Sequence, residues 1–229
     1  MKTFLFVYIA TDDYIYSFDG FIKSLNKFCP KVNKTVKLLT DHIDFDISIY
    51  NYDNIKINKY YIQHMPWPIN TLFKFHYINN FVNEDFDLLW YCNANFRFNE
   101  CKDIPKMFNK SDIFYFSYIN KVGEYSHWND NFNGIKYILG GLFCAGKKSI
   151  KDACNFIIEY INDKLYYQNS IENKHDETVL NYYHFYLNET NKNKFKIITL
   201  QDIGYLDMNI HKSGDDYKLE YDKINVLKI

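Results

Sequence analysis

The sequence has no C-x-x-C pair, and its five cysteines are odd in number and widely spaced. A small fold that depends on disulfide bonds would need an even, regularly spaced set of cysteines and an oxidising compartment. The simplest interpretation is therefore a set of free, mostly buried thiols in a reducing compartment. We expect a cytoplasmic protein, with a peripheral position at an inner membrane as the other possibility.

Long apolar runs and an excess of basic residues are also missing. No apolar segment approaches the ~20 residues that cross a membrane as a helix. The apolar residues 3–10 are followed at once by Asp12 and Asp13, so we interpret them as a first buried strand rather than a signal peptide. The formal net charge of −1 gives no positive field for nucleic acid. The sequence predicts neither a transmembrane segment nor a nucleic-acid partner.

Apolar and aromatic residues, by contrast, are abundant. Hydrophobic residues make up 47% of the 229 residues and aromatic residues alone 20%, most of them Tyr and Phe. Such a chain can bury a sizeable core, so we expect one α/β domain over residues 1–229 and no extensive disorder. Tyrosine also suits sugar and base surfaces because it offers a flat face and a hydroxyl.

Strand-like and helix-like segments alternate along the chain without a Pro- or Gly-rich linker or an internal repeat. This order predicts a mostly parallel α/β sheet. Strands are expected over residues 2–10, 36–39, 55–57, 88–92, 113–118 and 195–200. Apolar residues recur at helical spacing over residues 14–28, 71–81, 149–160 and 178–187. Ligands of such sheets sit beyond the carboxyl ends of strands, which is where residues 10–12 and 93–95 fall.

The strand over residues 88–92 runs directly into Asn93-Ala94-Asn95. Many sugar-nucleotide transferases end a buried strand with Asp-x-Asp, whose carboxylates hold a divalent ion on the donor diphosphate. Asparagine donates and accepts hydrogen bonds but brings no charge to a hard cation. Asn93 and Asn95 would share one side of the chain if it stays extended. The pattern indicates either a diphosphate site that works without a metal or a polar turn that closes the strand.

Lys174-His175-Asp176-Glu177-Thr178 precedes an apolar helix. Carboxylates at a helix start can serve a site beneath the helix dipole. The alternative is that Asp176 is an N-cap and Glu177 a first-turn acid, both for stability alone. A metal site of His175, Glu177 and His184 has no H-E-x-x-H pattern or cysteine framework behind it, so no metal ligand is predicted.

Two further features stay open between a local and a functional interpretation. Gly140-Gly141, inside the apolar residues 137–145, either lets another group approach the backbone closely or marks a bulge. Arg97, two residues after Asn95, either faces the same way as Asn95 or pairs at the surface with Glu100.

Taken together and in order, these segments resemble glycosyltransferase family 6, which includes the ABO blood-group transferases, the α1,3-galactosyltransferases and smaller bacterial members. The resemblance covers most of the chain. Residues 9–14 look like the family's uridine-binding start, and residues 67–75 like its W-P-x-N-T-L-(K/R)-(K/R)-F helix. Asn93-Ala94-Asn95 matches the N-A-N that bacterial members carry in place of D-x-D. Residues 137–143 look like the Y-Y-L-G-G-F-F donor-sugar strand, and residues 175–181 like H-D-E-S with the L-N that follows it.

The resemblance implies a GT-A fold and a retaining α1,3 transfer of GalNAc or Gal from a UDP-sugar to a galactose-containing, often fucosylated, acceptor glycan. It implies a UDP-sugar donor and no divalent metal. By carry-over, the donor-binding residues are Ile9, Ala10, Thr11 and Tyr14 at uracil and ribose, Lys74 in place of a donor-contacting Arg, Asn93 and Asn95 at ribose and diphosphate, and Leu139, Gly140, Gly141, His175 and Asp176 around the sugar.

Glu177 would lie beside the anomeric carbon, as a covalent nucleophile or as the stabiliser of an oxocarbenium-like ion. We expect it to be the catalytic residue under either mechanism. Without a metal, the charge on departing UDP must be balanced by the protein. Lys74, Arg97 and Lys228 are the cations that we expect to do so.

The residues Leu139-Gly140-Gly141 form the GalNAc-like pattern of the family. In the blood-group enzymes the position matching Gly141 is small for GalNAc and larger for Gal, because a missing side chain leaves room for the N-acetyl group. A methyl-sized clash is worth only about 1–3 kcal/mol, so Gal stays open as a donor.

Two departures from the family fall on the acceptor side. The strand over residues 113–118 is not followed by H-P-G-F-Y, and Lys174 stands where the family has Trp. Acceptor contacts are expected at Tyr118, Lys174 and Glu177, and the acceptor can differ from fucosyl-galactose. The alternatives are a transferase of this fold with another UDP-sugar, and a glycan- or nucleotide-sugar-binding module without turnover. The intact His175-Asp176-Glu177 disfavours the second.

Overall fold

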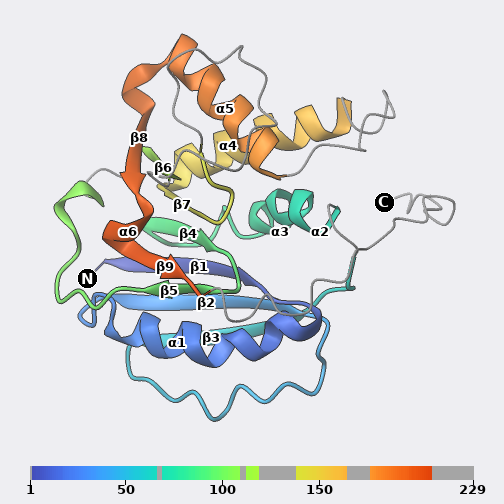
Figure 1. Cartoon of the computed structure of the whole chain (residues 1–229), viewed down its shortest axis with the longest axis vertical. Coiled ribbons are helices and arrows are strands. Elements are labelled where there is room, and N and C mark those ends of the chain that lie inside the picture. The colour runs from blue at the N-terminus through green and yellow to red at the C-terminus, as the bar shows by residue number, and fades with distance from the viewer. Residues whose placement is uncertain (1, 66–68, 109–111, 119–137, 164–175, 208–229) are drawn as a thin grey trace, which may run out of the picture.

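The computed structural model describes residues 2–65, 69–108, 112–118, 138–163 and 176–207. A seven-stranded sheet runs through this part of the chain, with the spatial order β3-β2-β1-β4-β7-β6-β8 (Figure 1). Its strands are β1 (Thr3–Ile9), β2 (Asn33–Thr40), β3 (Ile55–Tyr61), β4 (Leu88–Cys92), β6 (Phe114–Tyr118), β7 (Leu142–Ala145) and β8 (Phe195–Thr199). A second, two-stranded sheet pairs β5 (Phe96–Phe98) with β9 (Gly204–Leu206).

All strands of the large sheet except β7 run in one direction. β1 is parallel to β2 and β4, β2 to β3, and β6 to β8, whereas β7 is antiparallel to both of its neighbours. This topology confirms the mostly parallel α/β sheet of a GT-A fold. The register pairs Ile9 with Leu39 and Cys92 with Leu142, so β1, β2 and β4 end where β7 begins. That edge of the sheet is where a ligand is expected.

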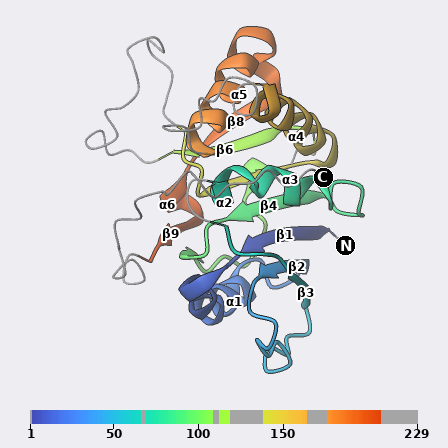
Figure 2. The ribbon, with the colours of Figure 1, turned by 90° about the vertical axis from the view of Figure 1, so that its right-hand side faces the viewer.

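Helices cover both faces of the large sheet. They are α1 (Phe18–Lys27), α2 (Ile69–Leu72), α3 (Lys74–Asn79), α4 (Lys147–Ile161), α5 (Asp176–Thr190) and α6 (Leu200–Ile203), with 3₁₀ segments η1 (Asp12–Ser17), η2 (Lys106–Phe108) and η6 (Lys192–Lys194). The core on one face joins α1 to β5 and α6, and the core on the other joins α3, α4 and α5. Figure 2 shows α1, α6 and β9 on one side of the sheet and α4 on the other.

Alternation along the strands divides the apolar residues between these two cores. Phe4, Phe6 and Tyr8 of β1 belong to the core beneath α1, whereas Leu5 and Val7 belong to the core beneath α3, α4 and α5. Strands buried on both faces read as continuous apolar runs. That is why β1 and β4 could be recognised from the sequence, β4 with its bounds unchanged.

Several elements differ from the sequence-based expectation. The helix expected over residues 14–28 is a 3₁₀ segment, η1, followed by α1, and the one expected over 71–81 is divided into α2 and α3. β2 and β3 are longer than predicted, and β5, β9 and α6 were not predicted. The missed elements have only three or four residues each, too few for a periodic pattern to stand out.

The five cysteines are free, as expected, with four buried and Cys101 half-buried. Burial raises the pKa of Cys154 to about 12, so its thiol stays protonated at neutral pH. Among the described helices, none combines the length and the apolar character that a bilayer-spanning helix needs.

Candidate active site

Four elements bring polar groups, of side chains and of backbone, to the edge where β4 ends and β7 begins. Asn93 follows β4, and Gly140 and Gly141 precede β7. The Asn93 N–H donates to the Gly141 carbonyl at 2.8 Å, which extends the β4–β7 pairing by one step. The other groups come from the first residues of two helices, Lys74 of α3 and Asp176 and Glu177 of α5.

The two glycines let side chains of this chain approach the backbone closely. A Cβ on Gly140 would collide with the Asp176 carboxylate and lie 2.8 Å from Cγ of Glu177. A Cβ on Gly141 would lie 2.9 Å from Nδ2 of Asn93. Of the two interpretations left open by the sequence, close approach is therefore the one that the structure confirms.

Lys74 is buried beneath these glycines, with 1% of its surface exposed. Its ammonium donates to the Gly140 carbonyl at 2.8 Å, forms an ion pair with Asp176, and lies 4.4 Å from the centre of the Tyr91 ring. A buried cation needs such partners because its desolvation is costly. Lys74 thus ties α3 to both α5 and the glycine segment, and a direct contact between Lys74 and the donor stays a prediction.

Asp176 and Glu177 are neighbours in sequence with different surroundings. Asp176 is buried, and as the first residue of α5 it directs its carboxylate to Lys74, so it is not simply an N-cap. Glu177 is half-buried, and its Oε1 accepts a hydrogen bond from the Gly140 N–H at 3.1 Å. The glycine segment is therefore held by a buried ion pair through its carbonyl and by Glu177 through its N–H.

Asn181, one turn along α5, fastens the segment that leads into the glycines. Its side-chain amide donates to the Ile138 carbonyl at 2.7 Å and accepts from the Ile138 N–H at 2.7 Å, as a neighbouring strand would. The same Nδ2 donates to the Glu177 carbonyl at 2.8 Å. Leu139 is buried, and its N–H donates to the Ser117 carbonyl at 2.9 Å. Sequence reasoning gave Asn181 no role beyond its place in a motif.

Asn93 is the half-buried member of the Asn-x-Asn pair. Tyr91 donates from its hydroxyl to Oδ1 of Asn93 at 3.4 Å. Burial and the nearby Asp176 carboxylate raise the pKa of Tyr91 well above its usual value of 10. The phenol therefore stays protonated and can orient the Asn93 amide with Nδ2 toward Gly141. Sequence reasoning also missed Tyr91, which reads there as one more apolar residue of β4.

Asn95 has a different position from Asn93. The Phe96 N–H donates to the Asn93 carbonyl at 2.9 Å, so the chain turns here instead of staying extended. Asn95 is buried, with its carbonyl accepting from the Asp207 N–H at 2.8 Å and its Nδ2 donating to the Asp207 carbonyl at 3.5 Å. The simple alternation that would place both amides on one side does not hold.

Arg97 is buried rather than paired with Glu100 at the surface. Its guanidinium donates to the carbonyls of Ala94 at 3.3 Å and Phe96 at 2.9 Å, and approaches the Asp207 carboxylate at 3.7 Å. A Cβ on Gly20 of α1 would lie 2.6 Å from its Nε. These contacts hold the turn after β4 against α1, and a contact between Arg97 and the diphosphate stays untested.

The predicted uridine residues lie at the end of β1, along the same edge of the sheet. Ala10 is buried, and its N–H donates to the Leu39 carbonyl at 2.9 Å. Ile9 is half-buried and Thr11 is buried, with the Thr11 carbonyl accepting from the Tyr14 N–H at 3.3 Å. Tyr14 is 40% exposed, and partial burial raises its pKa above 10. Its ring is therefore accessible to a ligand at this edge.

Other predicted residues lie elsewhere. Tyr118 is half-buried at the end of β6. Lys174, His175 and Lys228 lie outside the described residues. In the described part of the chain, no three His, Cys, Asp or Glu side chains come together as they would to hold a metal ion.

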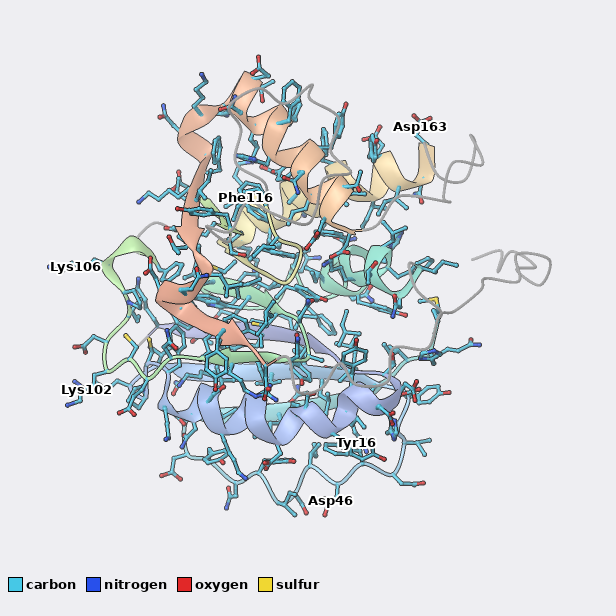
Figure 3. The ribbon with its side chains drawn as sticks, viewed as in Figure 1. Tyr16, Asp46, Lys102, Lys106, Phe116 and Asp163 are labelled. Atoms are coloured by element: carbon cyan, nitrogen blue, oxygen red, sulfur yellow. The ribbon has the colours of Figure 1, made fainter. Side chains whose placement is uncertain are left out.

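His184, which would have completed a metal site with His175 and Glu177, is buried between aromatic rings. It lies 5.1 Å from the ring of Phe116 on β6 and 4.9 Å from that of Phe195 on β8. Figure 3 labels Phe116 beneath α5. Burial lowers the pKa of His184 to about 4, so the imidazole is neutral at pH 7.

Comparison with known proteins gives a relative that matches most of the chain. The chain matches no protein-family model. It is 30% identical over 201 residues to the O-antigen biosynthesis glycosyltransferase WbnI of Escherichia coli, and the match covers 78% of this chain and 80% of that protein.

Proposed function

The chain belongs to the glycosyltransferase family of WbnI, and from that premise we propose that it is a retaining, metal-independent α1,3-glycosyltransferase of family 6. Its donor is UDP-GalNAc or UDP-Gal, and its acceptor is a galactose-containing glycan that can be fucosylated. The name of the relative supports the assembly of a surface polysaccharide such as O-antigen as the setting.

The observation that carries the proposal is the meeting of Glu177 with Gly140, and of Asn93 with Gly141, at one edge of the sheet. Glu177 accepts from the Gly140 N–H at 3.1 Å, which holds a carboxylate over backbone that has no side chain. A retaining transfer needs such a carboxylate near the anomeric carbon, either to attack it or to stabilise the positive charge that develops there.

Lys74 and Asp176 supply the rigid side of this arrangement. Their ion pair fixes the Asp176 carboxylate, which we expect to accept hydrogen bonds from hydroxyls of the donor sugar. Because Lys74 is buried and paired with Asp176, we assign it mainly to the position of that carboxylate, and its contribution to the charge balance of the departing diphosphate stays a prediction. Fixed charges in a site that excludes water stabilise a transition state more strongly than mobile ones.

Asn93 is the residue that we propose for the diphosphate contact. It is half-buried, and its Nδ2 can donate to a phosphate oxygen. A neutral amide is a poor ligand for a hard divalent ion unless carboxylates accompany it. Asn95 is buried against Asp207, so we assign it to the support of the turn.

The test is a donor panel with and without metal. The protein is incubated with UDP-GalNAc, UDP-Gal or UDP-GlcNAc in EDTA or in Mn²⁺, and UDP release is followed with and without a galactose-terminated acceptor. We expect release in EDTA, fastest with UDP-GalNAc, and slow hydrolysis without acceptor. Proton NMR of the glycan product should show an α-linked sugar.

Each contrary outcome points to a different error. Release that requires Mn²⁺ would contradict metal independence, and a β-linked product would contradict retention. A strong preference for UDP-GlcNAc would indicate another transferase of this fold. Binding of UDP-sugars without any release would indicate a binding module.

A further inference from the structure

The turn after β1 contains a residue in an unusual backbone conformation. Asp12 has a φ of 53°, and only one other non-glycine residue in the described ranges, Cys29, has a positive φ. The left-handed region is disfavoured for residues with a Cβ, although less for aspartate than for most, so contacts from neighbours add to its stability. Asp12 directly follows Thr11 and begins η1, which contains Tyr14.

Two residues that follow β2 hold the backbone of Asp12 on both sides. The Asp12 N–H donates to the two oxygens of Asp41, at 3.0 and 3.3 Å. His42 donates from Nε2 to the Asp12 carbonyl, at 3.0 Å. The parallel register of β1 and β2, which pairs Ile9 with Leu39, brings these segments together.

The conformation of Asp12 decides where the chain goes after β1. A left-handed residue at this point turns the backbone from the strand into η1, and the Tyr14 N–H then closes on the Thr11 carbonyl at 3.3 Å. Figure 3 labels Tyr16, which belongs to η1, beside the start of α1. Thr11 and Tyr14, two of the predicted uridine contacts, therefore lie on either side of the constrained residue.

We propose that Asp41 and His42 are positioning residues for the base-binding end of the donor site. They hold Asp12 in the left-handed region and so place Thr11 and Tyr14 for the nucleoside of a pyrimidine nucleoside diphosphate. This inference rests on the proposed function and goes beyond it, because neither residue belongs to a motif of the family resemblance. Asp41 acts through the Asp12 N–H, and an anionic carboxylate would repel a diphosphate placed beside it.

The test compares binding of uridine and of UDP with turnover. Asp41→Ala removes both acceptors of the Asp12 N–H. We expect calorimetry to show about tenfold weaker binding of uridine and of UDP alike, because the base end is disturbed and the diphosphate end is not. The KM for the UDP-sugar should rise by a similar factor, with kcat within about twofold of wild type.

A rescue variant separates positioning from direct contact. Glycine enters the left-handed region readily, so Asp12→Gly in the Asp41→Ala background should recover most of the lost affinity. Asp41→Asn, which keeps one acceptor oxygen, should lose less than Asp41→Ala. The matched control is Asp44→Ala, which removes an exposed acid from the loop after β2 and should leave binding unchanged. Circular dichroism confirms that each variant is folded.

The outcomes distinguish the inference from the proposed function. If wild type binds neither uridine nor UDP, the proposed function is wrong and this inference falls with it. If wild type binds both ligands, and Asp41→Ala and Asp41→Asn bind them as tightly as wild type does, the positioning role alone is refuted. Loss of binding that Asp12→Gly does not restore would assign Asp41 to direct ligand contact and would also refute it.

Discussion

The candidate site is held on two sides by charged or titratable side chains, which are buried on one side and partly exposed on the other. On the side of α5, a lysine and an aspartate pair in the interior, where Lys74 is 1% exposed. On the side of β1 and β2, Asp41 and His42 bind the backbone of Asp12 near the surface, with side-chain exposures of 22% and 36%.

The difference in burial predicts a difference in energetic weight. Charges removed from water depend on their partner, so breaking a buried pair leaves an uncompensated charge and destabilises the fold. Hydrogen bonds near the surface can be replaced by bonds to water, so their loss changes the local backbone geometry more than the free energy of unfolding. We therefore expect loss of the buried Lys74–Asp176 pair to alter folding, and changes at Asp41 or His42 to alter ligand binding.

The largest effect is expected when the buried pair is broken. Lys74→Met leaves Asp176 without its cation and Gly140 without a donor to its carbonyl. We expect the free energy of unfolding to fall by about 3–5 kcal/mol, measured by urea denaturation. Turnover should be lost as well, because the glycine segment is no longer fixed.

The matched control is another lysine–aspartate pair of the same chain. Lys148→Met breaks the pair with Asp152, which spans 2.8 Å but has side chains 73% and 55% exposed. We expect its effect on the free energy of unfolding to stay below about 1 kcal/mol. Equal losses of unfolding free energy in Lys74→Met and Lys148→Met would contradict the comparison, because burial would then not determine how much an ion pair contributes to stability.

A smaller effect is expected from His184, a buried histidine of α5. Its pKa falls from 6.5 when unfolded to about 4 when folded, because burial disfavours the charged form. Between these values the unfolded chain binds the extra proton, so stability that is present above pH 6.5 is lost as the pH falls toward 4. The loss should reach about 3 kcal/mol.

Denaturation curves from pH 7 to pH 4 measure this contribution as the difference between wild type and His184→Gln. The wild-type free energy of unfolding should fall more steeply than that of the variant. Parallel pH profiles would show that folding does not lower the pKa of His184. The core around α5 would then be more accessible to water than its burial indicates.

The smallest effect concerns the space at Gly141. Gly141→Ala would place a Cβ 2.9 Å from Nδ2 of Asn93, so the amide must move aside. We expect the preference for UDP-GalNAc over UDP-Gal to fall about tenfold, measured as the ratio of their kcat/KM values. The added methyl group occupies the space that we propose for the N-acetyl group of GalNAc. It also displaces the Asn93 amide, which we propose to contact the diphosphate.

A double-mutant cycle with Asn93→Ala sharpens this prediction. Once the amide is gone, the added methyl has nothing to displace, so part of the effect of Gly141→Ala should disappear. An unchanged effect in the Asn93→Ala background would mean that the glycine serves the sugar alone and that the two positions are not coupled.

The sequence predicted the central strands β1 and β4 well because they are buried on both faces. β4 is fully buried and was predicted with its bounds unchanged, and β1 was predicted to within one residue at each end. The turn at Asp12 was not predicted, since an aspartate after a strand does not reveal a left-handed backbone. The predicted single helix therefore became η1 followed by α1.

The sequence named residues of the candidate site through its motifs, but it did not reveal the contacts among them. The sequence placed Asn93, Gly141 and Glu177 together through the family resemblance. It could not show that Lys74 is buried, because a lysine in a short helix usually faces water. It also could not identify Asp41 and His42, whose role depends on the register of β1 and β2.

The central claim is that Glu177, held by the Gly140 N–H, acts on the donor sugar without help from a metal. UDP release from UDP-GalNAc in EDTA tests it directly when wild type is compared with Glu177→Gln and with Glu189→Gln, an exposed position at the far end of α5. We predict that Glu177→Gln lowers kcat by about 10³-fold at unchanged unfolding free energy, while Glu189→Gln matches wild type. Undiminished UDP release by Glu177→Gln would contradict the account, and so would a wild type that releases no UDP until Mn²⁺ is added.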